Sequence, residues 1–376
     1  MQAKKVGIIG LGMVGKIHLE MLNRIPQAEV IAAAEKDDET AELAMEKYNI
    51  PKVYNDWKDL IADPDIEVIH NCTPNFMHFE INKKIIDKGI PLLSEKPLGM
   101  DLEETKKSKD MAEEKGIPAG INFGYRHYPT VQWARSLIAD GYLGEIKAVH
   151  GIYLQDWLMF KTDYNWRVES KLGGKSRALA DIGLHWVDML RYLTGLEVEE
   201  VIADYATLIP KREKPTGNVE TFADSEEMET EEIDVDTEDW ASVLLRLNNN
   251  VRGDFTISQI SAGNKNNMKI EIDGSKRSLT WKQEDPEHLY VGERGGANHV
   301  LYKSPGKMSE KANQFASYPG GHPEGFADAV KNTFISFYQG IENNNTDYPT
   351  FAEAYEATKI IDAIMESKEK DKWIKV

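Results

Sequence analysis

A glycine-rich segment near the N-terminus constrains the fold more than any other feature of this 376-residue sequence. The run "KVGII" before it is typical of a buried strand, and "VGKIHLEMLNRI" after it has the apolar spacing of a helix. Between them, Gly10, Gly12 and Gly15 follow the pattern G-x-G-x-x-G. The first glycine allows a tight turn, the second lets backbone approach a pyrophosphate, and the third lets helix and strand pack closely. The segment, which includes Met13 and Val14, therefore predicts a dinucleotide-binding turn at a helix N-terminus.

The second strand-like segment, "AEVIAAAE", ends at Glu35, about 20 residues after Gly15. A carboxylate at this position accepts hydrogen bonds from the hydroxyls of an adenosine ribose and repels a 2′-phosphate. Glu35 therefore favours NAD as the cofactor, whereas the adjacent Lys36 leaves NADP open. The structural alternative is a glycine turn that binds no ligand.

Short apolar runs alternate with amphipathic segments through the first third of the chain. The strand-like segments include "EVIHNCTP" and "IPLLSEKP", and the helix-like segments "FMHFEINKKIIDKG" and "LEETKKSKDMAEEKG" each stop at a glycine. Such alternation indicates a parallel, doubly wound α/β sheet of the Rossmann type. We place this dinucleotide-binding domain at residues 1–125.

The pattern changes in the remainder of the chain. Segments such as "GEIKAVHGIYLQDW" and "NMKIEIDGSKRSLTWKQ" alternate apolar and polar residues over strand lengths, and "NNN" and "DGS" supply turns. We therefore expect residues 126–376 to form an α+β domain for substrate binding and oligomerisation, built on an open, mainly antiparallel sheet. A sheet with one apolar outer face needs a cover, which points to self-association.

Polar residues follow two further strands of the expected parallel sheet. Open α/β sheets bind ligands at the carboxyl edge of their strands. The segment "CTPNFMH" therefore places four candidates for the wall of the cofactor site: Thr73, Pro74, Asn75 and His78. For His78 alone, a surface position on a helix is equally compatible with the sequence. In "SEKPLG", Glu95 and Lys96 follow another strand, and Lys96 would point toward the nicotinamide end of the cofactor.

The segment "ALADIGLHWVDML" places Asp181, His185 and Asp188 on nearly one side of a helix. Such residues can hold a metal, pass a proton or tie the helix to its neighbours. No second His or Cys cluster stands at ligand spacing, so we expect no metal and regard Asp188 as a structural partner. His185 is the better general base, because an imidazole titrates near neutral pH, and Asp181 can orient it. Lys96 can stabilise a developing alkoxide.

Composition excludes several other classes of protein. The net charge of −18 argues against nucleic-acid binding, and no apolar run is long enough to span a membrane. The N-terminus lacks the pattern of a secretion signal, and the lone Cys72 suits a reducing compartment, so we expect a cytoplasmic protein. We interpret the acidic stretch 223–239 as a solvated loop rather than a cation trap.

Taken together, "GLGMVG", "TPN", "EKP", "NFGYR" and "DIGLHWVD" resemble, in order and spacing, the Gfo/Idh/MocA family of oxidoreductases. The resemblance covers essentially the whole chain. It implies a catalytic group of Lys96, Asp181 and His185, and a homodimer or homotetramer formed through the C-terminal sheet. It also implies cofactor contacts from Asn75, Glu95, Asn122 and Arg126.

A closer resemblance, carried by "GIYLQDW", "TDYNWR", "GGKSRALADIG" and "YPGGHPEGF", is to the branch of levoglucosan dehydrogenase-like and glycoside 3-dehydrogenase-like enzymes. That branch acts on pyranose rings carrying a non-sugar or anhydro substituent. It implies Trp166 and Arg167 near the nicotinamide. The substrate contacts it implies, beside the catalytic group, are Tyr128, Gln155, Asp156 and His322, although a packing role for His322 stays open.

Three hypotheses follow. The first is a dehydrogenase that oxidises a secondary hydroxyl of a glycoside, anhydrosugar or inositol, at the 3-position of a pyranose, while nicotinamide accepts the hydride. The second is an enzyme that retains NAD and uses internal redox chemistry, as in glycoside cleavage. The third is a non-catalytic NAD or sugar sensor on the same fold, which the joint presence of Lys96, Asp181 and His185 disfavours.

Overall fold

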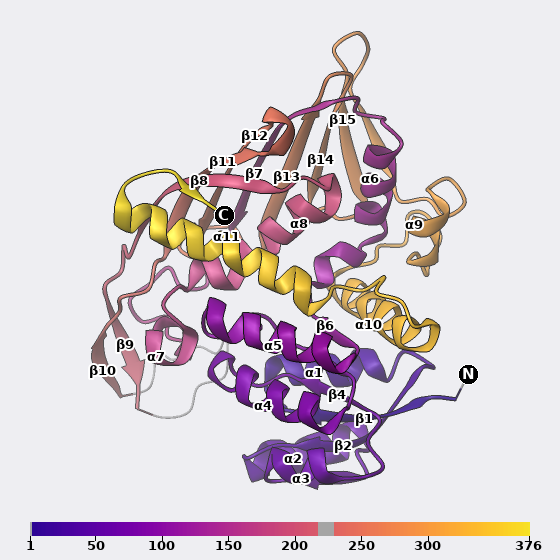
Figure 1. The fold of residues 1–376 in the computed structure, drawn as a ribbon, viewed down its shortest axis with the longest axis vertical. Helices are drawn as coiled ribbons and strands as arrows, with labels where there is room; N and C mark the ends of the chain where they lie inside the picture. The colour runs from indigo at the N-terminus through magenta and orange to yellow at the C-terminus, as the bar shows by residue number, and fades with distance from the viewer. Residues whose placement is uncertain (1, 217–228) are drawn as a thin grey trace. The chain divides into compact units, whose positions relative to one another are not determined.

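The computed structural model describes residues 2–216 and 229–376, which form two compact units (Figure 1). The first unit comprises the chain up to Phe123, together with Lys171–Gly174 and Val330–Glu356. The second comprises Gly124–Ser170, Lys175–Ala329 and Ala357–Val376. Helices α10 (Phe326–Asn343) and α11 (Phe351–Lys370) contribute residues to both units.

The first unit contains a six-stranded parallel sheet with the strand order β3-β2-β1-β4-β5-β6. Its strands are β1 (Lys4–Ile9), β2 (Ala28–Ala34), β3 (Lys52–Tyr54), β4 (Val68–Asn71), β5 (Leu92–Ser94) and β6 (Ala119–Ile121). Every residue of β4, β5 and β6 is buried, as expected for parallel strands with both faces covered. This sheet confirms the predicted doubly wound Rossmann architecture.

Helices follow the strands of this sheet as the sequence predicts. They are α1 (Met13–Leu22), α2 (Asp38–Tyr48), α3 (Trp57–Ala62), α4 (Asn75–Lys88) and α5 (Leu102–Lys115), with α4 and α5 side by side in Figure 1. The predicted glycine stops are confirmed, because Gly89 and Gly116 end α4 and α5 in the left-handed region, with φ of 78° and 64°. The short β3 and α3 carry too few apolar residues to show a period in the sequence.

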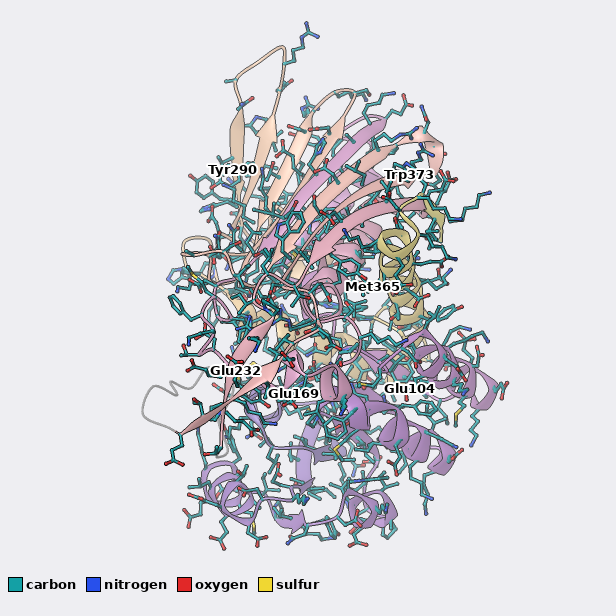
Figure 2. The ribbon with its side chains drawn as sticks, turned by 90° about the vertical axis from the view of Figure 1, so that its left-hand side faces the viewer. Glu104, Glu169, Glu232, Tyr290, Met365 and Trp373 are labelled. Carbon is teal, nitrogen blue, oxygen red and sulfur yellow. The ribbon has the colours of Figure 1, made fainter. Side chains whose placement is uncertain are left out.

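The second unit contains a nine-stranded sheet with the strand order β16-β15-β14-β13-β7-β12-β11-β8-β17. Its strands are β7 (Ile146–Leu154), β8 (Val198–Ala206), β11 (Trp240–Leu247), β12 (Arg252–Ser258), β13 (Asn267–Gly274), β14 (Ser278–Lys282), β15 (His288–Gly292), β16 (His299–Tyr302) and β17 (Ile374–Lys375). Only the β7–β12 pair is parallel among the described neighbours, which confirms the predicted, mainly antiparallel sheet. Figure 2 shows Tyr290 toward one side of this sheet and Trp373 toward the other.

The remaining elements of the second unit lie beside this sheet or connect its strands. They are α6 (Pro129–Ala139), α7 (Ser170–Gly173, shared with the first unit), α8 (Leu184–Thr194), α9 (Glu310–Gln314), β9 (Lys211–Pro215) and β10 (Thr230–Asp234), with single helical turns at Gly124–His127, Trp166–Val168 and Asn248–Asn250. On one face of the sheet, Trp186 of α8 stacks on Phe255 of β12 with ring centres 4.4 Å apart. A Cβ atom on Gly151 of β7 would lie 2.1 Å from the indole nitrogen of Trp186, so the close packing of α8 requires this glycine.

The opposite face of the nine-stranded sheet is mixed, so the expectation of an apolar outer face is wrong. Leu244 of β11 is 53% exposed and lies opposite Ile202 of β8. In the same row, however, His150 of β7 pairs with Asp254 of β12. Period-two alternation identifies the side that points away from the helices, but it does not make that side apolar.

Where the structure describes it, the acidic stretch 223–239 does not form the predicted solvated loop. Residues 223–228 lie outside the described residues, and Thr230–Asp234 forms β10, which pairs with β9. Glu238 and Asp239 are 1% and 0% exposed. The prediction is wrong here because the Asp239 carboxylate pairs with the buried Arg177 and Arg212. The Glu238 carboxylate accepts hydrogen bonds from the Ser176 hydroxyl and from backbone nitrogens.

No helix among residues 2–216 and 229–376 is both long and apolar enough to cross a membrane.

Candidate active site

The glycine turn after β1 has the geometry that a dinucleotide requires. Gly10 adopts φ of +88°, and a Cβ on Gly15 would lie 2.0 Å from the carbonyl oxygen of Gly10. A Cβ on Gly12, in contrast, would meet no atom within 4 Å. Gly12 is also the N-cap of α1 and provides no side-chain cap. The open space beside Gly12 and the uncapped helix N-terminus therefore fit a pyrophosphate, with Met13 and Val14 in the first turn of the helix.

Glu35 follows β2 and turns its carboxylate toward this glycine turn. Its Oε2 accepts a hydrogen bond of 2.7 Å from the backbone nitrogen of Leu11, and its Oε1 accepts one of 2.7 Å from that of Lys36. The carboxylate is thus fixed beside the turn, where it can accept further bonds from ribose hydroxyls. The side chain of Lys36 is exposed.

The residues predicted to line the cofactor wall lie at the end of β4 and the start of α4. Thr73 donates its hydroxyl to Asn71, and Asn75 donates its amide to the carbonyl of Gly173, at 2.7 and 3.1 Å. Pro74 is the N-cap residue of α4.

His78 is only 1% exposed, so the alternative of a surface histidine is wrong. Its ring nitrogens lie 2.6 Å from the carbonyl oxygen of Pro97 and 2.7 Å from that of Thr73. His78 therefore joins the two segments that follow β4 and β5.

Glu95 and Lys96 follow β5 directly. The Oε1 atom of Glu95 lies 3.0 Å from Nε2 of His18 and accepts a 2.5 Å hydrogen bond from Asn122. Burial alone would raise the pKa of Glu95, but the hydrogen bonds from His18 and Asn122 and the charge of Lys96 lower it to about 2. The carboxylate is therefore ionised at neutral pH. The Oδ1 atom of Asn122 is buried and accepts no hydrogen bond among the described residues, which leaves an acceptor for a ligand.

The segment that carries Asp181 and His185 departs from a regular α-helix. Leu179–Gly183 forms a π-helical turn that continues into α8, and such turns recur at functional sites. From residue 178 to 190, only Ala180, Asp181 and His185 are partly exposed. Asp188 does not share this side, because it is buried and pairs with Arg126, whose Nε donates at 2.8 Å. The predicted structural role of Asp188 fits this geometry.

Two side chains of the second unit contact the Asp181 carboxylate. The Nε2 atom of Gln259 donates to Oδ2 at 2.8 Å, and Nε of Arg167 lies 3.7 Å from Oδ1. Arg167 also stacks on Trp166, with 4.4 Å between the guanidinium carbon and the ring centre. The predicted residues Trp166, Arg167 and Asp181 therefore lie together, and Gln259 joins them without any signal in the sequence.

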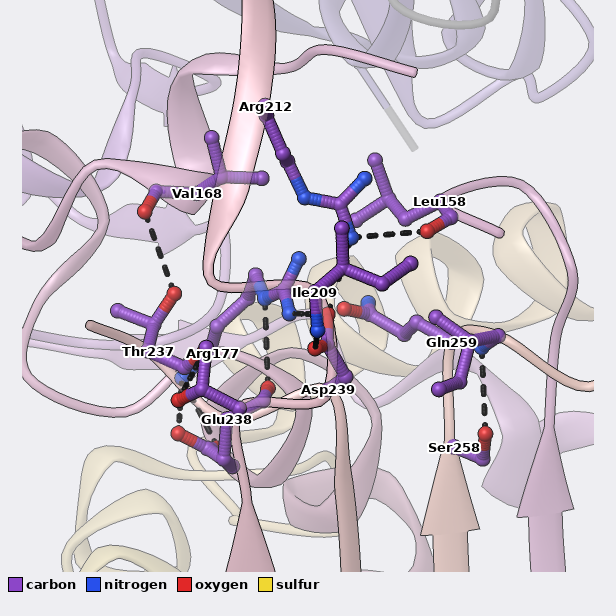
Figure 3. Close-up of polar contacts among 12 residues, drawn as sticks. Leu158, Val168, Arg177, Ile209, Arg212, Thr237, Glu238, Asp239, Ser258 and Gln259 are labelled. Carbon is purple, nitrogen blue, oxygen red and sulfur yellow. Dashed lines mark hydrogen bonds and ion pairs between the residues drawn. The ribbon is translucent and has the colours of Figure 1, made fainter. Parts of the chain in front are cut away.

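Gln259 is held beside a buried charged cluster (Figure 3). Its backbone nitrogen donates to the carbonyl oxygen of Asp239 at 3.0 Å. The Asp239 carboxylate pairs with both Arg177 and Arg212, and all three of these side chains are fully buried. This cluster fixes the strand ends from which Gln259 reaches Asp181.

His185 lies beside a second polar group, of which only Gln155 is predicted from the sequence. Its ring meets that of Tyr125 edge-on, with centres 4.8 Å apart. The amide of Asn266 donates to the Tyr125 hydroxyl at 3.0 Å, and its Oδ1 accepts from Tyr153 and Gln155 at 2.6 and 2.9 Å. The predicted substrate residue Gln155 thus belongs to a hydrogen-bonded group organised by Asn266.

Three other predicted substrate residues have different surroundings. Tyr128 is 1% exposed and accepts a 3.4 Å bond from Gln283, and its burial raises the pKa of the phenol. Asp156 accepts from Lys265 at 2.8 Å. His322 is exposed on a loop.

Lys96 belongs to the first unit and is partly exposed, whereas Asp181 and His185 belong to the second. The catalytic group therefore stays a prediction. Within the described part of the chain, no group of three or more His, Cys, Asp or Glu side chains is arranged to hold a metal ion.

Two family models match the chain. "Oxidoreductase family, NAD-binding Rossmann fold" matches residues 4–123, and "GFO/IDH/MocA C-terminal domain" matches residues 131–280. Levoglucosan dehydrogenase of Pseudarthrobacter phenanthrenivorans is 31% identical over 100% of this chain and 99% of its own length. Glucose-6-phosphate 3-dehydrogenase of Bacillus subtilis is 25% identical over 96% of each chain.

The fold has solved counterparts as well. A structure of levoglucosan dehydrogenase in complex with NADH and levoglucosan is 29% identical and covers 100% of both chains, with a TM-score of 0.90. The first unit is thus an NAD-binding Rossmann domain, as predicted from the glycine turn. The chain belongs to the Gfo/Idh/MocA family of oxidoreductases.

Proposed function

We propose that the protein is an NAD-dependent dehydrogenase that oxidises a secondary hydroxyl of a sugar-like ring, at the 3-position of a pyranose, in the cytoplasm. The substrate class is a glycoside, an anhydrosugar or an inositol. The observation that carries the proposal is the pair Asp181 and His185, the only charged or titratable side chains partly exposed between residues 178 and 190. The names of the relatives, a levoglucosan dehydrogenase and a glucose-6-phosphate 3-dehydrogenase, support a sugar substrate.

Each residue of the proposed catalytic group has a separate role in the reaction. His185 removes the proton of the hydroxyl, because an imidazole titrates near the working pH. Asp181, held by Gln259 and Arg167, orients the substrate or the imidazole. Lys96 stabilises the developing alkoxide with its positive charge. NAD, when bound, accepts the hydride.

For the cofactor, we assign the pyrophosphate to the turn of Gly10, Gly12 and Gly15, and the adenosine ribose to Glu35. The remaining cofactor contacts that we propose are Thr73, Pro74, Asn75, His78, Glu95, Asn122, Arg126, Trp166 and Arg167. Substrate contacts are proposed for Tyr128, Gln155, Asp156 and His322.

A panel of glycosides, anhydrosugars and inositols, incubated with NAD or NADP and followed by NADH absorbance, tests the proposal. We expect at least one anhydrosugar or glycoside to be oxidised, and the Lys96→Met variant to lose that activity. A protein that binds NADH but oxidises no member of the panel would instead fit the sensor hypothesis. NAD that survives gel filtration would point to internal redox chemistry.

We also propose that the protein self-associates as a homodimer or homotetramer through the outer face of the nine-stranded sheet. Leu244 and Ile202 supply apolar area there, and the flanking His150–Asp254 pair supplies polar contacts. Light scattering of the wild type and of Leu244→Glu measures this directly. A wild-type mass equal to one chain would refute it.

A further inference from the structure

Four buried polar side chains form a continuous chain through the first unit, from Glu95 to Tyr338. Nε2 of His18, on α1, lies 3.0 Å from Oε1 of Glu95, and Nδ1 of His18 lies 2.9 Å from Nδ1 of His70, on β4. Nε2 of His70 lies 3.0 Å from the hydroxyl of Tyr338, on α10. None of the four residues is more than 7% exposed, and Phe334 packs against both imidazole rings.

The ionised carboxylate at one end determines which atom donates at the first link. A carboxylate only accepts hydrogen bonds, so His18 donates to Glu95 from Nε2. Burial lowers the pKa of His70 well below its ordinary value, so this ring carries a single proton. We assign this proton to Nδ1 of His70, which then donates to Nδ1 of His18. Nε2 of His70 then accepts from the Tyr338 hydroxyl.

We propose that His18, His70 and Tyr338 are positioning residues that fix the Glu95 carboxylate for NAD, with every donor pointing from Tyr338 toward Glu95. The Oε1 atom of Glu95 is taken up by His18 and Asn122. Among the described residues, its Oε2 accepts only a 3.3 Å bond from the backbone of Lys96, which leaves it able to accept from a ligand. The inference rests on the proposed role of Glu95 as a cofactor contact.

The arrangement also explains why three polar side chains are retained in an otherwise apolar core. A buried imidazole with an unmade hydrogen bond is costly, so each link stabilises the direction of the next. Rotation of the Glu95 carboxylate would leave His18 without its acceptor. The chain therefore resists the rotation of Glu95 that a solvated carboxylate would undergo freely.

The direction of the donors can be measured without any ligand. Nitrogen-15 NMR of the whole protein at neutral pH distinguishes the two neutral tautomers of histidine from the charged ring. We expect His18 to carry its proton on Nε2 and His70 on Nδ1. A proton on Nε2 of His70, or two protons on either ring, would overturn the proposal.

Substitutions of His70 test the effect on the cofactor. His70→Asn keeps an amide donor near the position of Nδ1, whereas His70→Leu removes both nitrogens. We expect NADH affinity within about threefold of wild type in the first variant and about tenfold weaker in the second, and a tenfold loss corresponds to about 1.4 kcal/mol of binding free energy. Equal affinities in both variants and in wild type would refute the positioning role.

Two further measurements separate positioning from loss of packing. Tyr338→Phe should weaken NADH binding several-fold. Tyr348→Phe should not, because this buried tyrosine of the same unit does not belong to the hydrogen-bonded series from Glu95 to Tyr338. In His70→Leu, the loss of NADH affinity on acidification should move to higher pH, because Glu95 ionises less readily. Besides His18, the titratable groups that face Glu95 are Lys96 and Cys72. A protein that binds NADH normally but oxidises no sugar would refute the proposed substrate and leave this inference standing.

Discussion

The imidazole of His185 lies edge-on against the ring of Tyr125, with 4.8 Å between the ring centres. Replacing His185 with alanine removes the proposed base but leaves the glycine turn and Glu35 unchanged. Single-turnover NADH formation should therefore slow by a factor on the order of 10²–10⁴, with NAD affinity unaltered. Asp181→Asn should fold normally and impair turnover to a similar or lesser degree.

A control is His150→Ala, which removes a half-exposed histidine that pairs with Asp254. Its rate should equal that of the wild type. Normal single-turnover kinetics in His185→Ala, with normal NAD binding in the same sample, would remove His185 from the mechanism and leave Lys96 as the candidate base.

The geometry of the glycine turn predicts different effects for substitutions of Gly12 and Gly15. Gly12→Ala adds a methyl group to open space, so the protein should fold normally and bind NADH roughly tenfold more weakly, as about 1.4 kcal/mol implies. Gly15→Ala should instead lower the free energy of unfolding by about 1–3 kcal/mol, because its Cβ would meet the Gly10 carbonyl at 2.0 Å. Denaturation curves and NADH fluorescence titrations separate the two effects. Gly295→Ala, also beside open space, should change neither quantity.

Glu35 should govern the choice between NAD and NADP. Glu35→Gln keeps an acceptor for the backbone of Leu11 but removes the charge that repels a 2′-phosphate. The ratio of kcat/KM for NAD to that for NADP should therefore fall several-fold. Glu29→Gln, at an exposed position on the same strand, should leave the ratio unchanged. Equal efficiencies with both cofactors in the wild type would contradict the assignment and direct attention to Lys36.

Activity should not depend on a metal ion. If Lys96 stabilises the alkoxide, dialysis against a strong chelator should leave the rate of sugar oxidation unchanged. Loss of activity on chelation, with recovery on addition of zinc or manganese, would show that the role assigned to Lys96 is wrong.

Stability should fall in mild acid because of His127. Burial, followed by the charges of Arg126, Lys311 and Arg135, lowers the pKa of His127 to about 3. Below the unfolded pKa, near 6.5, the unfolded chain takes up a proton that the folded chain does not. Stability contributed by the neutral ring is therefore present above about pH 6.5 and lost progressively as the pH falls toward 3.

Between pH 6.5 and pH 5, the contribution of His127 to the free energy of unfolding should fall by about 1.5 kcal/mol. Urea denaturation at the two pH values measures it. The His127→Gln variant should lose that much less stability than the wild type over this interval. Identical losses in the two proteins would show that His127 is not buried in its neutral form.

The features that could be predicted from the sequence are those that local geometry dictates. Gly10 is required by its positive φ and Gly15 by its close approach to the Gly10 carbonyl, and Glu35 follows at the end of the adjacent strand. The helix stops at Gly89 and Gly116 are local in the same sense.

The features that could not be predicted depend on contacts between distant segments. The buried His78 contacts the carbonyl oxygen of Pro97, in the segment that follows β5, and Asp239 is buried because Arg177 and Arg212 enclose it. Asn266 reaches Tyr125 across 141 residues of sequence. Sequence periodicity does not show which distant residues will be in contact. The acidic composition of 223–239 alone therefore led to the prediction of a solvated loop.

The return of Val330–Glu356 to the first unit has a consequence for the order of events during synthesis. The glycine turn, Glu35 and Glu95 all leave the ribosome long before Phe334, whose ring covers His18 and His70. The backbone of Pro349, which accepts a 2.9 Å bond from Ile121 of the edge strand β6, emerges later still. A nascent chain that stops near residue 123 therefore exposes two histidines and an unpaired strand edge, which chaperones and proteases recognise. Competence to bind NAD should appear only when translation is nearly finished.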